Sequence, residues 1–321
     1  MALNQTEIRV QGRPVMVPSV ELNGNTVITT GKWLKTAALR DEELVEGDPV
    51  GDPKLFVKGL KDTALPADIL TFSQRLPDIT PRYAYYLEWE SMAAIRITTF
   101  QDWLHRRVEY DVRKALKKAA KLGVSVRTVA FDDALISGIV RIYNESPIRQ
   151  GKRFWHYQKS FETVKMEKST YLERSEFIGA YYENELIGFI KMVYVDRIAS
   201  TLHVISRTKH ASKKPTNALI AKAVDICEQK KITHLVYGNY RYGDMNSSLT
   251  EFKRRNGFEE ICVPRYYIPL TAKGRLCLEL GLHHGIKPVL PRSILRALRS
   301  ARSKFYKLQL AGKSNAQAES Q

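Results

Sequence analysis

The clearest hydrophobic pattern of the chain lies between Asn217 and Thr271. Apolar residues at roughly helical spacing, with charged residues between them, predict a helix over 217–232. A short apolar strand, His234 to Tyr237, follows, and then a polar loop rich in Gly, Asn and Tyr. A second, basic helix is expected to end at Asn256-Gly257, a typical C-terminal capping signal. An aromatic strand over 261–270 closes this region.

Before this region, segments with the helical spacing of apolar residues alternate with strand-like segments. Thr99 is a good N-cap for a long helix that ends at Gly123. A strand is expected next, over 124–129, and then two helices, over 133–144 and 161–168. A meander of three strands should follow, over 176–182, 185–195 and 198–207. In the first hundred residues we expect strands over 7–10, 15–22, 26–30, 55–60 and 92–98, and helices over 33–44 and 66–76.

This order of elements resembles the GNAT superfamily of N-acyltransferases over residues 108–271. The basic passage LKKAAKLGV (116–124) also resembles the Fem-type aminoacyltransferases, as does a Leu-x-x-Phe-Lys helix near a glycine, here Leu249, Phe252, Lys253 and Gly257. The resemblance implies an α/β (α+β) fold, with a mixed, mostly antiparallel sheet flanked by helices. Fem-type proteins contain two GNAT-like halves, so a degenerate first half is expected over 1–100.

The domain prediction follows from these elements. Residues 1–100 form an N-terminal αβ domain, 101–272 the GNAT-like domain, 273–312 a basic helical extension, and 313–321 a disordered tail. The segment 287–313 carries eight Lys or Arg and no Asp or Glu. An amphipathic basic helix of this kind suits peripheral contact with an anionic membrane surface.

Charge changes the picture more than any other compositional property. With 51 Lys and Arg against 34 Asp and Glu, the net charge is +17, which favours anionic partners such as a phosphate-bearing donor or tRNA. The chain begins with no signal-peptide pattern and contains no apolar run of membrane-spanning length, so we expect a cytoplasmic protein, peripheral at the inner face of the membrane. Three scattered cysteines and the absence of HxH or HExxH predict no metal site.

Acyl transfer to an amine needs a base for the amine and an acid for the leaving group. The resemblance implies that these groups lie in the loop after the short strand and on the third meander strand. Tyr240 and Tyr242 are candidates for the acid, His203 for the base, and Asp244 is an alternative base. Each tyrosine can equally be a packing residue, and a lone strand histidine is commonly structural.

The donor in GNAT proteins rests on backbone amides before the helix that follows the meander, usually within Arg/Gln-x-x-Gly-x-Gly/Ala. This chain has RTKHASKKPTNAL there, without a glycine. Candidate phosphate-binding residues are Arg207, Lys209, Lys213, Lys214, Thr216 and Asn217. The donor is left open between acyl-CoA, such as acetyl-CoA, and aminoacyl-tRNA, which Fem-type proteins use without that signature.

We expect the acceptor substrate to bind at the basic aromatic loop between the helices predicted over 133–144 and 161–168. Its candidate substrate-binding residues are Arg149, Arg153, Trp155 and His156. The leading hypothesis is an N-acyltransferase acting on an amine of a sugar, lipid-linked or peptide precursor in cell-envelope biosynthesis. The alternative is a non-catalytic GNAT-fold module that binds RNA or an anionic membrane. Nothing in the sequence indicates an oligomeric state.

Overall fold

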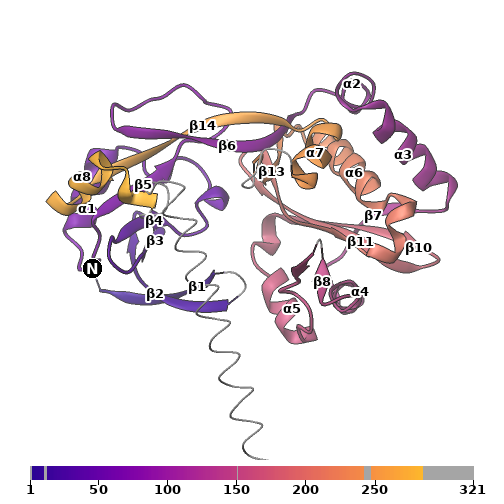
Figure 1. Ribbon diagram of the computed structural model, residues 1–321, viewed down its shortest axis with the longest axis horizontal. Helices are drawn as coiled ribbons and strands as arrows, with labels where there is room; N and C mark the ends of the chain where they lie inside the picture. Colours follow the sequence, from indigo (N-terminus) through magenta and orange to yellow (C-terminus); the bar gives the residue numbers. More distant parts are fainter. Residues whose placement is uncertain (1, 11–12, 150, 242–246, 285–321) are drawn as a thin grey trace, which may run out of the picture.

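The structure is a computed structural model, which describes residues 2–10, 13–149, 151–241 and 247–284. In this part of the chain, a twelve-stranded sheet runs in the order β1-β2-β3-β4-β5-β14-β6-β13-β12-β11-β10-β7. Helices cover both of its faces (Figure 1). The mixed, mostly antiparallel α/β fold expected from the sequence is confirmed.

The N-terminal part, residues 2–96, begins with an antiparallel meander. Its strands are β1 (Asn4–Val10), β2 (Arg13–Leu22), β3 (Asn25–Thr30) and β4 (Thr36–Leu39). The 3-10 helix η1 (Glu42–Leu44) and helix α1 (Pro53–Lys61) follow, and β5 (Ile69–Ser73) then pairs with β4 in parallel. The last strand of this part is β6 (Tyr86–Arg96).

The C-terminal part, residues 100–284, has the element order expected for the second half of the chain. Its strands are β7 (Ser125–Val129), β10 (Ser175–Tyr182), β11 (Glu185–Val195), β12 (Ile198–Ser206), β13 (His234–Asn239) and β14 (Glu259–Pro269), with a small hairpin of β8 (Ile148–Arg149) and β9 (Lys152–Arg153). Its α-helices are α2 (Phe100–Asp102), α3 (Tyr110–Lys121), α4 (Asp133–Tyr143), α5 (Phe161–Lys168), α6 (Pro215–Gln229), α7 (Ser248–Arg255) and α8 (Ala272–Glu279). Shorter turns are η2 (Trp103–Arg107), η3 (Leu172–Arg174), η4 (Thr208–Lys213) and η5 (Leu282–His284).

Two long strands, β6 and β14, connect the two parts, because each pairs with a strand of the part to which it does not belong. β14 comes after α7 in the C-terminal part, yet it pairs with β5, where Arg265 lies opposite Ser73. β6 belongs to the N-terminal part but pairs with β13, where Ile95 lies opposite Leu235. The two strands also pair with each other and form the arch at the top of Figure 1. Each part therefore completes its sheet with a strand of the other, while a domain boundary near residue 100 stays a prediction.

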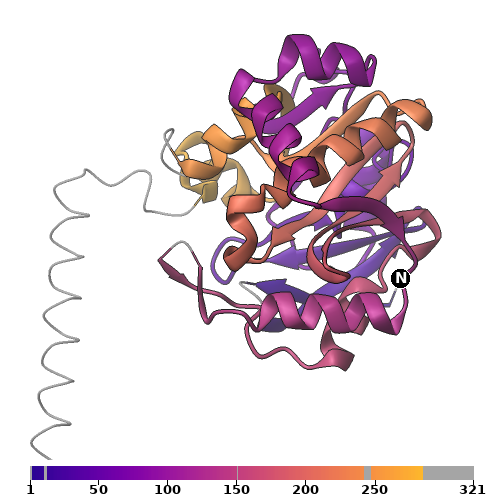
Figure 2. The same cartoon turned by 90° about the vertical axis from the view of Figure 1, so that its right-hand side faces the viewer.

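The hydrophobic core is divided by the sheet. On one face, α6 packs on β10 to β13 and α3 packs against α6, with Leu219, Ile220 and Ala223 fully buried. On the opposite face, α4 packs on β11, with Ile136 and Phe189 fully buried. Figures 1 and 2 show α3 and α4 on opposite sides of the sheet. The N-terminal part has a core of its own around α1.

Three elements of the N-terminal part were predicted wrongly. Residues 55–60, expected as a strand, lie in α1, because the side chain of Asp52 caps the N–H groups of Lys54 and Leu55 and Pro53 opens the helix. Residues 33–44, expected as a helix, contain β4 and η1. Residues 66–76, also expected as a helix, contain β5, whose buried apolar run suits a central strand.

The long helix expected from Thr99 to Gly123 is also interrupted. Val108 adopts an extended conformation between the π-helical turn η2 and α3. The indole N–H of Trp103, itself fully buried, donates to the carbonyl of Asn256 at 3.0 Å. This tertiary contact joins η2 to the end of α7, and the separate helix α3 begins at Tyr110.

Candidate functional site

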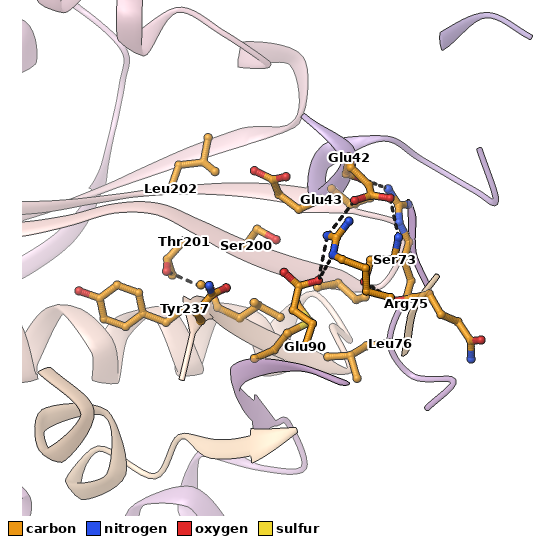
Figure 3. Close-up of a pocket in the computed structure, with 18 residues that line it drawn as sticks. Glu42, Glu43, Ser73, Arg75, Leu76, Glu90, Ser200, Thr201, Leu202 and Tyr237 are labelled. Atoms are coloured by element: carbon orange, nitrogen blue, oxygen red, sulfur yellow. Dashed lines mark hydrogen bonds and ion pairs between the residues drawn. The ribbon is translucent and has the colours of Figure 1, made fainter. Parts of the chain in front are cut away.

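A cavity of about 460 Å³ lies where the two parts of the chain meet. This volume is typical of a site for a small ligand. Figure 3 shows side chains from both parts around it: Ser200, Thr201, Leu202 and Tyr237 from β12 and β13, and Glu42, Glu43, Ser73, Arg75, Leu76 and Glu90 from the N-terminal part and β6. The remaining lining residues are Gln74, Met92, Val195, Ile198, Val236, Gly238, Asn239 and Arg265.

The cavity opens because β12 and β13 separate. They pair in parallel only from Ile198 to Ser200, and the hydroxyl of Thr201 then donates to the carbonyl of Val236 at 3.0 Å. Leu202 has no register partner on β11, since Met192 pairs with Thr201 and Lys191 pairs with His203. This bulge places Leu202 outside the ladder at the point of separation, where it lines the cavity.

Glu43 supplies a carboxylate inside the cavity. Figure 3 shows its side chain pointing across the cavity toward Ser200 and Leu202. Within the described residues its carboxylate makes no hydrogen bond or ion pair with another side chain, and it accepts a hydrogen bond from the backbone N–H of Glu43 itself. Although Glu43 is an exposed residue, the protein atoms around its carboxylate desolvate it and raise its pKa; the negative charge of Asp41 adds to this effect and the N–H of Glu43 itself opposes it. A raised pKa suits a carboxylate to proton transfer near neutral pH.

The neighbouring acidic groups are neutralised by one arginine. Arg265 of β14 donates to Glu90 at 3.0 Å and to Glu42 at 3.0 Å. Glu42 also accepts a hydrogen bond from the backbone N–H of Ser73 at 2.6 Å. Burial raises the pKa of Glu42, although the positive charge of Arg265 acts to lower it. Among the acidic residues that line the cavity, Glu43 is thus the carboxylate left available for a ligand.

Lys253 holds the other wall of the cavity in place. This fully buried residue of α7 donates to the carbonyls of Tyr237 and Asn239, each at 2.7 Å. Both carbonyls belong to the end of β13, which lines the cavity. Burial lowers the pKa of Lys253 to about 8. The Leu-x-x-Phe-Lys pattern therefore has a structural role at this wall.

The predicted catalytic residues do not line this cavity within the described part of the chain. Tyr240 is half-buried, packs against the core beneath α6 and donates its backbone N–H to Ser91. His203 lies on the α4 side, 3.0 Å from the Tyr143 hydroxyl and stacked on Phe189. Burial holds the pKa of His203 well below its usual range, so the ring is neutral there. Tyr242 and Asp244 lie outside the described residues.

The backbone amides expected to hold the donor phosphates are taken by a carboxylate of the protein itself. Glu145, which follows α4, accepts the N–H of Thr208 at 2.6 Å and that of Lys209 at 3.0 Å. It is also bound by Arg149 at 3.1 Å. Although burial opposes the charge, these hydrogen bonds and Arg149 lower the pKa of Glu145. As arranged, these amides do not fit a CoA pyrophosphate.

The other predicted donor residues make internal contacts. Arg207 pairs with Glu185, and Thr216 bonds to Ser206 at 2.8 Å. Asn217 donates to Asn256 at 3.0 Å and so joins α6 to α7. Lys213 lies over the ring of Tyr182, while Lys214 takes a left-handed conformation at the start of α6. Residues 207–217 therefore form a basic surface at the end of β12, outside the cavity.

The predicted acceptor loop divides into a buried and an exposed pair. Arg149 donates to the carbonyls of Ser206 and Ile142, and His156 is buried against Tyr143. Arg153 and Trp155 are exposed. Only this second pair is available to a ligand in the arrangement seen.

The acidic side of the cavity was missed by the sequence interpretation. Glu42 and Glu43 lie in an acidic run, DEELVEGD (41–48), within a strongly basic chain, and this run is the one signal that pointed to them. Arg265 and Glu90 carry no such signal, because they meet only through the exchange of β6 and β14.

Known structures share this fold. The C-terminal domain of a putative lysylphosphatidylglycerol synthetase from Agrobacterium fabrum matches 79% of this chain and 84% of its own, at 13% identity and a TM-score of 0.50. The L-PGS structure from Bacillus licheniformis matches 76% and 80%, at 13% identity and a TM-score of 0.51. FemX aligns over 87% and 90%, at 10% identity and a TM-score of 0.49. No protein-family model and no curated protein matches the sequence.

The chain has a GNAT-like fold. The resemblance to GNAT proteins and their Fem-type relatives, inferred from the order of elements, holds at the level of the fold. None of the helices in the described residues is long and apolar enough to span a bilayer.

Proposed function

We propose that this protein is an N-acyltransferase whose reaction takes place in the cavity between β12 and β13. The observation that carries the proposal is the Glu43 carboxylate, which is bound by no other side chain of the described residues and faces the bulge at Leu202 across that cavity. A base and a bulged strand on opposite walls leave space for an amine and an acyl carbonyl between them.

The residues support a direct transfer. Glu43 attracts the substrate ammonium group and takes its proton, which frees the amine nitrogen. That nitrogen forms a bond to the acyl carbon while the backbone N–H of Leu202 stabilises the carbonyl oxygen. The C–O or C–S bond of the donor then breaks, and the proton passes from Glu43 to the departing oxygen or sulfur. The new amide nitrogen loses its extra proton to the Glu43 carboxylate, which releases it to solvent.

Glu145 favours an aminoacyl ester, carried by tRNA, over acyl-CoA as the donor. A carboxylate on the amides of Thr208 and Lys209 repels a pyrophosphate at the place where GNAT proteins bind CoA. The exposed lysines of α3 (Lys114, Lys117, Lys118 and Lys121) and the Lys-rich surface before α6 suit a longer phosphate backbone.

The acceptor proposed is an amine of a sugar, lipid-linked or peptide precursor of the cell envelope. The Agrobacterium fabrum synthetase domain of the same fold carries a phospholipid in its name, which supports an anionic lipid-linked acceptor at the cytoplasmic face of the membrane. Arg153 and Trp155 provide an exposed cation and aromatic ring for its headgroup. Contact of the segment 287–313 with that membrane lies outside the described residues.

The experiment is a transfer assay with purified full-length protein. Radiolabelled aminoacyl-tRNAs and acyl-CoAs are offered in parallel with amine acceptors from each proposed class. We expect transfer from one or more aminoacyl-tRNAs that ribonuclease treatment abolishes. Transfer from acyl-CoA alone would contradict the donor assignment, and no transfer from any donor would contradict the proposal itself.

A non-catalytic binding module is the second candidate, since the donor loop lacks glycine and its amides are occupied. Such a module would bind RNA or anionic vesicles and show no turnover. Binding that is unchanged in Glu43→Gln, with an inactive wild type, would favour this candidate over the enzyme.

A further inference from the structure

Three side chains capable of binding a metal converge at the far end of β6 and β14. Glu88 lies on β6, and His283 and His284 lie in η5. The Nε2 atom of His283 is 2.8 Å from Oε1 of Glu88, and the Nε2 atom of His284 is 2.6 Å from Oε2. The three ligand atoms lie within 4.8 Å of one another.

The surroundings hold this cluster in position. The Tyr267 hydroxyl donates to Oε2 of Glu88 at 3.1 Å. The rings of Tyr86 and Tyr267 pack edge-to-face against His283, whose side chain is 3% exposed. His284 is 50% exposed, so the cluster is closed on one side and open to solvent on the other.

Helix α8 fixes the backbone that carries the two histidines. A Cβ atom added at Gly274 would lie 2.0 Å from the carbonyl of Asp68, so α8 lies directly against the start of β5. The side chain of Thr271 caps this helix and also donates to Asp68 at 3.0 Å. The histidines therefore approach Glu88 from a packed element.

We propose that Glu88, His283 and His284 form a binding site for Zn²⁺ or a similar divalent transition-metal ion. Two imidazole nitrogens and one carboxylate oxygen are a known zinc ligand set, with a fourth position left for water. The open side at His284 provides that position. Nδ1 of His283 has no hydrogen-bond partner, so Nε2 is the nitrogen through which this ring is held at the site.

The spacing fits a bound ion after a small movement. Ligand bonds of about 2.0–2.2 Å in a tetrahedral site separate ligand atoms by roughly 3.3 Å. The two nitrogen–oxygen distances, 2.8 and 2.6 Å, are about 0.5 and 0.7 Å shorter than this separation. The ligand atoms as a set lie within 4.8 Å of one another, and the half-exposed His284 has room to move. The ion replaces the protons now shared between the imidazoles and the carboxylate.

The site would tie η5 to β6 beside the cavity. Glu90, which lines the cavity, is two residues from Glu88 on the same face of β6, and Arg265 is two residues from Tyr267 on β14. The ion is thus placed to stabilise the exchanged strands, and it takes no part in acyl transfer.

The test is metal binding by the full chain after treatment with a chelator. Zn²⁺ titrated by calorimetry should bind at one ion per chain and raise the melting temperature, and Co²⁺ should give the visible absorption of a tetrahedral site. His284→Ala and Glu88→Gln should each weaken Zn²⁺ binding by about tenfold or more. His105→Ala, at an exposed histidine outside the cluster, should bind as the wild type does.

The exposed position of His284 makes His284→Ala informative even if a His283 variant does not fold. Absence of Zn²⁺ binding at micromolar concentration would overturn the proposal. Equal binding by the wild type, Glu88→Gln and His284→Ala would also overturn it, because the ion would then lie elsewhere.

Discussion

The carboxylate of Glu145 accepts a hydrogen bond from the backbone N–H of Thr208 at 2.6 Å. Glu145 also accepts the N–H of Lys209, so a side chain of the protein satisfies the amides that precede α6. An anion-binding position at the end of β12 is therefore filled from within the chain. This contact, together with the glycine-free sequence, separates the donor loop from the usual GNAT pattern.

Removal of that carboxylate should open the position to an external anion. Glu145→Ala leaves the two amides without their partner and removes the carboxylate beside Arg149, so we expect CoA to stabilise this variant and not the wild type. Thermal shift with CoA measures the difference, and Glu162→Ala, at an exposed glutamate, is the control. Wild-type protein that is stabilised by CoA as strongly as Glu145→Ala would contradict this interpretation.

Lys253→Met should loosen the wall formed by β13. The variant loses hydrogen bonds to the carbonyls of Tyr237 and Asn239, and we expect destabilisation by about 1–3 kcal/mol. A displaced wall should also lower the transfer rate by roughly ten- to a hundredfold. Urea unfolding and the transfer assay measure the two effects. Arg254→Met, at the exposed neighbouring residue, should stay within about 0.5 kcal/mol of the wild type.

Sequence patterns predicted the region from Asn217 to Thr271 well because its elements carry local signals. α6 and α7 have apolar stripes, Ser247 caps α7, and Gly257 takes a positive φ of 80° just after it. The N-terminal part lacks such signals. Whether its short elements become strands or helices depends on burial in the folded protein, as for β5. Its acidic residues Glu42 and Glu43 reach the cavity because they lie in η1.

The position of β14 could not be predicted from its own residues. Its aromatic, β-branched pattern indicates a strand but does not choose its partners. Pairing with β5 places Arg265 opposite Ser73, and the Arg265 side chain then reaches Glu42 and Glu90. The site therefore depends on a long-range exchange between residues separated by more than half the chain.

Arg265→Met should destabilise the protein in a pH-dependent way. Glu42 then keeps a buried charge without its partner, which costs on the order of 3–5 kcal/mol near neutral pH. Because the pKa of Glu42 is already raised in the folded state, its protonation on acidification relieves this cost. Urea unfolding should therefore show a smaller deficit at about pH 5 than at about pH 7.

Glu42→Gln in the Arg265→Met background is the matched control. It removes the unpaired charge, so the double variant should regain stability at about pH 7 and lose the pH dependence. A deficit of equal size at both pH values in the single variant would mean that packing, and not charge, sets the cost.

The transfer rate of Glu43→Gln against that of Glu46→Gln tests the central claim most directly. Glu46 is an exposed glutamate outside the cavity, so its variant should keep the wild-type rate. The wild-type rate should rise with pH through the raised pKa of Glu43, since the base acts when it is deprotonated. Glu43→Gln should lose that rise and about 10²- to 10⁴-fold in rate. An unchanged rate and pH profile in Glu43→Gln would contradict the assignment of Glu43 as the base.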